Sequence, residues 1–194
     1  MSMYESDNNI VNDNLFNNNN FGILTSTSKN NNISNNSFMS DGSDIWRNDI
    51  WISGGQNNTI SKNICQTRKG YGINLEVTTH NIVTGNEMMK NGIYLKGSSI
   101  EEWTTHSIDK LNTVNGKPVI YMKNSVGGIV PNGAGQIILA NCSSVIVDNQ
   151  NLSNGLYGLQ VGYSSNNTIR NNTVLNNYLS GIYIYESDGN IISN

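Results

Sequence analysis

The sequence predicts an all-β protein that folds as a single-stranded parallel β-helix, a solenoid of about nine coils. Short stretches alternate apolar and polar residues with the period of two that is typical of half-buried strands. One template recurs nine times at a mean spacing of about 23 residues, and a repeat of this length indicates a solenoid. Each copy is too short to bury its own apolar residues, so neighbouring copies must stack.

The clearest copy covers residues 157–174, YGLQVGYSSNNTIRNNTV. Leu159 and Val161 alternate with the polar Gln160, and Ile169 is the next apolar residue after a polar turn. Val174 follows a second polar pair. The stretch therefore predicts three short strands and two corners.

Eight further copies repeat this pattern, with two inward first-strand residues and one second-strand isoleucine in each. In chain order these are Met1, Met3 and Ile10; Ile23, Thr25 and Ile33; Ile50, Ile52 and Ile60; Ile73, Leu75 and Ile82; Ile93, Leu95 and Ile108; Ile120, Met122 and Ile129; Ile137, Leu139 and Ile146; Ile182, Ile184 and Ile191. The copies near residues 93–108 and 120–129 are the weakest. Insertions at residues 40–48 and 98–107 lengthen two coils, and nothing marks a second domain within residues 1–194.

A small polar residue stands three positions after almost every second-strand isoleucine. These positions hold Asp13, Asn36, Asn63, Gly85, Leu111, Asn132, Asn149, Asn172 and Asn194. Asn, Asp and Gly enter the left-handed region at least cost, which a tight corner needs. Stacked asparagines also form hydrogen-bonded ladders. We therefore expect asparagine ladders, with the regular corner lost at Leu111.

Composition limits the functional classes. The net charge is −3 and 13% of residues are charged, so no basic surface indicates a nucleic-acid partner. The sequence has no apolar run of 18 residues, and its first residues do not show the pattern of a signal peptide, so we expect no membrane span in this segment. Neither end carries a cap. We expect flanking coils in a longer chain, with end-to-end self-association as the alternative.

Two cysteines are present, Cys65 in a third strand and Cys142 in a turn. They lie four copies apart, which corresponds to roughly 19 Å along a stack with the usual strand spacing. A disulfide requires Cα atoms within about 7 Å. We therefore expect two free thiols.

The repeat GI-Y-L…SxxNxIxxN resembles the repeats of the NosD-like and carbohydrate-binding/sugar-hydrolase (CASH) families. Within residues 103–154, the stretches WTTHSID, NTVNGKPVIYMKN and GAGQIILANCSSVIVDNQNLSN look like the core of NosD-like proteins, including archaeal surface proteins of that kind. The resemblance implies a right-handed parallel β-helix located outside the cell or at its surface. It leaves the function open, because this fold hosts binding, structural and catalytic roles.

The resemblance to NosD also implies copper, which Cys, Met or His ligands bind in a close cluster. The sequence contains only His80 and His106, and its six methionines are mostly scattered. We therefore expect no metal site and no cofactor. A NosD-type copper accessory protein remains the second alternative function.

The middle residue of each first strand should point outward. These residues are Ser2, Leu24, Trp51, Asn74, Tyr94, Tyr121, Ile138, Gln160 and Tyr183. On the same face, Ser53, Glu76 and Lys96 follow two positions later. Trp51, Asn74, Glu76, Tyr94 and Lys96 should therefore form one patch, called the outer patch here. The two insertions should flank it with Asp44, Trp46, Arg47, Glu101, Glu102, Trp103 and His106.

Aromatic faces stack on sugar rings, and carboxylates and amides bind their hydroxyl groups. The outer patch therefore suggests a polysaccharide-binding groove that uses Trp51, Asn74, Tyr94, Lys96, Trp46, Arg47 and Trp103. The alternative interpretation is that the outward aromatic residues only support the sheet. Catalysis would need an acid and a base near one sugar, for which Glu76, His106 and Asp44 are the main candidates, with Asp49 and Glu101 as further carboxylates.

We interpret the chain as an extracellular or cell-surface module with a structural or polysaccharide-binding role. A polysaccharide lyase, epimerase or hydrolase acting in the same groove is the first alternative.

Overall fold

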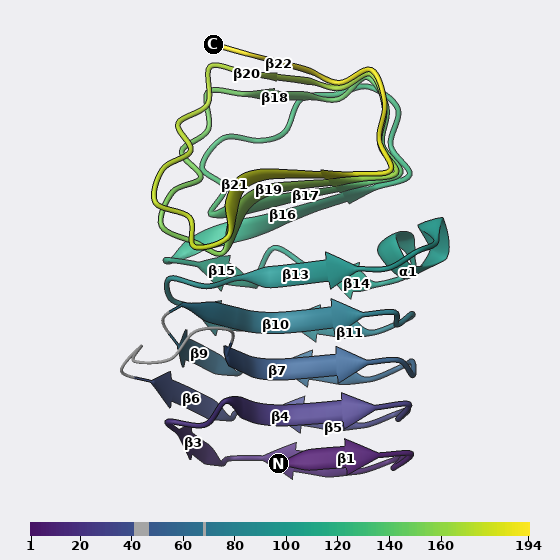
Figure 1. Cartoon of the computed structure of the whole chain (residues 1–194), viewed down its shortest axis with the longest axis vertical. Helices are drawn as coiled ribbons and strands as arrows, with labels where there is room; N and C mark the ends of the chain where they lie inside the picture. Colours follow the sequence, from purple (N-terminus) through teal and green to yellow (C-terminus); the bar gives the residue numbers. More distant parts are fainter. Residues whose placement is uncertain (41–46, 68) are drawn as a thin grey trace.

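The computed structural model describes residues 1–40, 47–67 and 69–194. In this part of the chain the protein is a right-handed parallel β-helix of about eight turns with one short helix, α1, which confirms the predicted fold class. The coils form two stacks that meet at an angle. In Figure 1 the N-terminal coils are seen from the side, whereas the C-terminal coils are seen down their own axis.

Three parallel sheets form the N-terminal stack, residues 1–114. The first sheet contains β1 (Ser2–Tyr4), β4 (Phe21–Ser26), β7 (Arg47–Ser53), β10 (Gly70–Glu76) and β13 (Ile93–Lys96). The second contains β2 (Ile10–Asn12), β5 (Asn32–Ser34), β8 (Thr59–Ser61), β11 (Ile82–Thr84) and β14 (Ser107–Ile108). The third contains β3 (Leu15–Asn17), β6 (Ser37–Ser40), β9 (Ile64–Thr67), β12 (Glu87–Met88) and β15 (Thr113–Val114).

The first-strand columns have the predicted register. Ile23, Ile50 and Ile73 pair across neighbouring strands and are fully buried. On the opposite face, Trp51 pairs with both Leu24 and Asn74. Alternation in the sequence was therefore enough to assign inward and outward residues in this sheet.

In the second strands the prediction was wrong by one residue in several copies. Ile10 is 71% exposed and Ile82 is 47% exposed, while the next residues, Val11 and Val83, are buried and pair with inward isoleucines. Ile129 and Ile146 likewise lie next to Val130 and Val147, which are the buried residues. In the last coil Ile192, not Ile191, pairs with the inward Ile169, although both isoleucines are exposed there. Each of these positions is one of two adjacent apolar residues, so hydrophobicity alone cannot choose which one faces inward.

The corners contain two adjacent columns of residues, and not the single column expected from the sequence. Asp13, Asn35, Lys62 and Gly85 adopt φ values of 59°, 54°, 53° and 65° and form the left-handed corner. The residue after each one belongs to a ladder in which each backbone N–H donates to the next side-chain oxygen, along Asn14, Asn36, Asn63, Asn86 and Asn112. Asn14 is exposed at the end of this ladder, and the other four asparagines are buried. The asparagine ladder is thus confirmed, but Asn36 and Asn63 are its rungs and not the left-handed residues.

Leu111 changes the corner as expected, because no residue from 109 to 112 has a positive φ. Instead, the Asn112 N–H donates to the Asp109 carbonyl at 3.2 Å and closes a turn with one extra residue. Asn112 still reaches the ladder, so the irregular corner does not interrupt the stack.

The chain then reverses direction in a hairpin, which the prediction of one continuous stack did not include. Strand β15 pairs in antiparallel fashion with β16 (Lys117–Lys123), and Val114 lies opposite Lys117. Asn115 and Gly116 connect them with φ values of 52° and 76°, the conformation of a two-residue type I′ hairpin. As a result β16 does not continue the first sheet beyond β13.

The C-terminal stack, residues 117–194, contains the remaining coils. One face consists of β16, β17 (Gln136–Ala140), β19 (Tyr157–Gly162) and β21 (Ser180–Tyr185). A second face consists of β18 (Ile146–Asp148), β20 (Thr168–Arg170) and β22 (Ile191–Ser193). Within each face the neighbouring strands pair in parallel, so the same coil geometry resumes after the hairpin.

Two glutamine side chains join the stacks by pairing with the free edge of β13. The Gln136 amide accepts from the Ile93 N–H at 2.9 Å and donates to the Ile93 carbonyl at 2.7 Å. The Gln160 amide accepts from the Leu95 N–H at 3.1 Å and donates to the same carbonyl at 2.7 Å. These side chains satisfy the backbone groups that a sixth parallel strand would otherwise pair with.

Candidate functional site

The outer patch has the predicted register on the first sheet. Trp51, Asn74 and Tyr94 are neighbours across β7, β10 and β13, and Glu76 lies beside Lys96. The Lys96 ammonium donates to Glu76 Oε1 at 2.6 Å. This hydrogen bond to Glu76 raises the pKa of Lys96. The pair therefore presents a donor and an acceptor with no net charge at the surface.

Trp51 is half-buried and contacts Phe21, with 5.5 Å between the ring centroids. Its Nε1 and the neighbouring Asn74 Oδ1 are buried, and neither has a hydrogen-bond partner within the part of the chain that the structure describes. A buried donor and acceptor without partners on one face are unusual.

Tyr94 was predicted to be an exposed sugar-binding ring, and this is wrong. Its side chain is buried among three aromatic rings, at centroid distances of 5.4 Å from Tyr71, 5.2 Å from Tyr157 and 6.1 Å from Tyr183. Burial raises the pKa of Tyr94 far above its ordinary value and that of Tyr157 to about 12, so both hydroxyls stay protonated. The C-terminal stack covers Tyr94, which the sequence pattern could not show.

Asn74 and Arg47 are also buried rather than exposed on a groove. The Asn74 side-chain amide donates to Asn48 Oδ1 at 3.1 Å. Arg47 Nη1 donates to the Asn19 carbonyl at 3.4 Å. Asp44 and Trp46 lie outside the described residues, so their predicted positions beside the patch stay predictions.

The insertion at residues 98–107 forms α1 (Ile100–Thr104), and its Trp103 is 1% exposed. The ring packs so closely on Gly162 that an added Cβ there would overlap with it. It also stacks on Tyr185 with 6.1 Å between centroids, and its Nε1 donates to the Gly97 carbonyl at 3.3 Å. The prediction of an exposed Trp103 is therefore wrong, because the ring fills the junction between the stacks.

His106 has a structural position that excludes its predicted role as an accessible base. It occupies the last rung of a second ladder that runs through Asn9, Asn31, Asn58 and Asn81. The Asn81 N–H donates to His106 Nδ1 at 3.3 Å, and Nε2 lies 3.0 Å from the Glu102 carbonyl, to which it donates in the neutral tautomer. Burial lowers the pKa of His106 to about 4. His106 is therefore a neutral substitute for asparagine in a ladder.

The other candidate acidic residues do not form a catalytic pair with it. Glu102 accepts hydrogen bonds from the Ser98 and Ser99 N–H groups and so caps α1. Asp49 is buried and accepts from the Asn91 amide at 3.1 Å. Glu101 is exposed on the helix. Among the described candidates, only Glu76 combines a carboxylate with partial exposure in the outer patch.

A small cavity of about 150 Å³, which the sequence pattern does not indicate, lies where the first sheet meets the C-terminal stack. We call it the junction cavity. Its lining residues are Val77, Lys96, Gly97, Ser98, Trp103, Tyr183 and Tyr185. These residues come from two coils of the N-terminal stack and from the last coil of the C-terminal stack. Only the Asn-Gly hairpin signal at Asn115 and Gly116 could have indicated that these coils meet.

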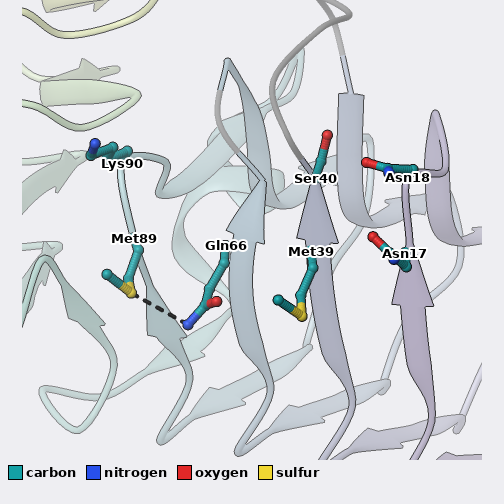
Figure 2. Close-up of a pocket in the computed structure, with 7 residues that line it drawn as sticks. All are labelled: Asn17, Asn18, Met39, Ser40, Gln66, Met89 and Lys90. Atoms are coloured by element: carbon teal, nitrogen blue, oxygen red, sulfur yellow. Dashed lines mark hydrogen bonds between the residues drawn. The ribbon is translucent and has the colours of Figure 1, made fainter.

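A groove of about 600 Å³, separate from the junction cavity, runs over the outer face of the third sheet. Figure 2 shows its lining residues: Asn17, Asn18, Met39, Ser40, Gln66, Met89 and Lys90. Met39 is 45% exposed and Met89 is 50% exposed. Gln66 lies between them along the sheet, and its Nε2 lies 3.4 Å from the Met89 sulfur. The groove thus presents two thioethers among amide groups.

Comparison with known families identifies the chain. A model described as the right-handed β-helix region matches residues 88–194, in agreement with the fold. A second model, described as periplasmic copper-binding protein (NosD), matches residues 1–127. The chain therefore belongs to the right-handed parallel β-helix proteins and, among them, to the NosD family. No curated protein and no solved structure matched.

Family membership indicates a location in the periplasm or at the cell surface. No helix among the described residues has the length and apolar character needed to cross a membrane.

The donor groups of this chain do not fit the copper ion in the family's description. Cys65 and Cys142 are free but buried, and both His106 nitrogens are occupied. The described residues, which include every His, Cys and Met of the chain, hold no group of three His, Cys, Asp or Glu that could bind a metal. Met39 and Met89 supply two thioethers without an imidazole or thiolate beside them.

Proposed function

We propose that this protein is a cell-surface or periplasmic β-helix module that binds a neutral polysaccharide at the angle between its two stacks. The observation that supports this best is the set of partly exposed aromatic rings on both sides of the Lys96–Glu76 ion pair. Phe21 and Trp51 lie on one side, and Tyr183 and Tyr185 lie on the other. Such rings suit the apolar faces of sugars, and the ion pair suits their hydroxyl groups.

The charge distribution favours a neutral ligand over an acidic one. Lys96 is already paired with Glu76, the net charge of the chain is −3, and Arg47 is buried. A polymer of uronic acids would need cations that are free to neutralise it.

Affinity electrophoresis tests the proposal with dextran, xylan and mannan as neutral polymers and with alginate and polygalacturonate as acidic ones. We expect at least one neutral polymer to retard the protein and both Trp51→Ala and Lys96→Met to weaken the retardation. Met39→Ala, which removes an exposed side chain from the groove of the third sheet, is the matched control and should bind normally.

Retardation by the acidic polymers alone would contradict a neutral ligand. If no polymer retards the protein, the aromatic residues only support the first sheet and join the stacks, and the module is a rigid structural unit. Shortening of the polymer during the assay would instead support the lyase, epimerase or hydrolase alternative.

A further inference from the structure

The junction cavity contains the features of a binding site for one sugar ring. Its volume of about 150 Å³ is below the range of about 300–1,000 Å³ that is usual for drug-sized ligands. Since one water takes about 30 Å³ in the liquid, this space holds about five waters. That is room for a single ring, and not for a stretch of polymer.

Aromatic side chains form the inner wall of the cavity. Trp103 is buried and stacks on Tyr185 with an interplanar angle of 7°. Tyr183 stacks on Tyr185 at 6.4 Å, and both tyrosines are partly exposed. The same packing that joins the stacks therefore leaves partly exposed rings at the cavity, suited to the apolar face of a sugar.

Polar groups lie at the first-sheet side of the cavity. Lys96 lines it and keeps Glu76 within 2.6 Å, so a donor and an acceptor are held together. Ser98 lines the cavity with an exposed side chain, and its backbone N–H is already bound to Glu102 Oε2 at 2.7 Å. The geometry thus combines an apolar wall with a neutral pair of hydrogen-bonding groups, as ligand sites usually do.

We propose that the junction cavity binds the terminal residue of a neutral glycan, so that the protein recognises chain ends rather than chain interiors. A residue inside a chain must continue in two directions, whereas Trp103 and the two tyrosines close the inner side of this space. This inference rests on the proposed function and specifies which part of the polysaccharide is bound.

The test compares intact dextran, xylan or mannan with acid-hydrolysed samples of the same polymer as competitors in affinity electrophoresis. Cutting the mean chain length to about one tenth should lower the half-inhibitory mass concentration about tenfold, because binding then follows the number of ends. If fragmentation leaves that concentration unchanged or raises it while the intact polymer still binds, end recognition is wrong and the proposed function stands. If neither sample binds for any polymer, the proposed function fails as well.

Variants that fill the cavity give a second readout. In Ser98→Trp, hydrolysis of the polymer should no longer lower the half-inhibitory mass concentration. Val77→Phe should give the same result and replaces Ser98→Trp if that variant does not fold. Val126→Trp adds the same bulk as Ser98→Trp at a position that is 85% exposed on another coil, and it should behave like the parent protein. An unchanged gain in a folded Ser98→Trp or Val77→Phe protein would exclude the junction cavity.

Discussion

The outward columns of the two stacks occupy the same position in the coil but have different environments. In the N-terminal stack, Trp51 stays half-buried on an open face. In the C-terminal stack, the equivalent Ile138 and Gln160 are fully buried against the end of the other stack. The repeat therefore determines which way a side chain points, whereas the packing of whole stacks determines whether it meets solvent or protein.

The comparison also explains why a glutamine appears in an outward column. Gln160 would be an unremarkable surface residue on a free solenoid face. Here its amide pairs with the backbone of Leu95 and Ile93, because β13 has no parallel neighbour after it.

Trp103→Ala should cause the largest loss of stability. Removing a buried tryptophan leaves a cavity and costs about 3–5 kcal/mol in the free energy of unfolding. Trp51→Ala, on the half-buried outer column, should cost clearly less. Chemical denaturation of both variants measures the difference, and equal costs would mean that the contact between the stacks adds little.

Stability should fall as the pH is lowered from about 6.5 to about 4, because of His106. Its folded pKa of about 4 is below the ordinary value of 6.5, so the unfolded state binds the proton first. The contribution of His106 to the free energy of unfolding is therefore fully present above pH 6.5 and is lost as the pH falls towards 4. At about 1.4 kcal/mol per pKa unit, the total loss is about 3 kcal/mol.

Two variants isolate this effect in denaturation curves between pH 7 and pH 4. His106→Asn restores the residue type of the other rungs and should remove this part of the pH dependence. His80→Asn makes the same exchange at an exposed turn and should retain it. If the two variants respond equally to pH, His106 is not the group responsible.

Gln160→Leu should have a smaller effect that is confined to the junction. The substitution leaves the buried Leu95 N–H without an acceptor, which costs about 1–3 kcal/mol. Hydrogen exchange should show faster exchange at Leu95 than at Ile73 inside the sheet. Gln66→Leu, on the partly exposed outer face of the third sheet, is the control and should change stability by no more than about 0.5 kcal/mol.

Copper should have the smallest effect, with no change in melting temperature when Cu(I) or Cu(II) is added or chelated. A ligand stabilises a protein only if it binds the native state, and the described donors form no copper cluster. A saturable rise in melting temperature that disappears in the Met39→Leu/Met89→Leu double variant would contradict this and place copper in the groove of Figure 2.

Much of the local structure could be predicted from the sequence. The strand alternation placed Ile50 inward and Trp51 outward, and the recurring Asn residues predicted the ladders. The second strands were harder, because pairs such as Ile10 and Val11 are both apolar. There the ladder residue three positions after the inward one, such as Asn14 after Val11, sets the register.

Only part of the candidate site could be predicted from the sequence, and the reason differs from that given for the second strands. Glu76 and Lys96 are neighbours in the repeat, so their contact follows from the period. The burial of Tyr94 and Trp103 depends on Tyr183 and Tyr185, which lie some 80 to 90 residues further along the chain. No periodic rule relates these positions, because the hairpin at Asn115 and Gly116 breaks the stack between them.

The coil can be read from the sequence: its period, its ladders and the direction of most first-strand side chains depend on contacts between residues one coil apart. The path of the chain after the hairpin, the covering of outward residues and the junction cavity become visible only in the folded structure. Those features depend on the free edge of β13, whose backbone groups must be satisfied and are satisfied by Gln136 and Gln160 from a distant part of the chain.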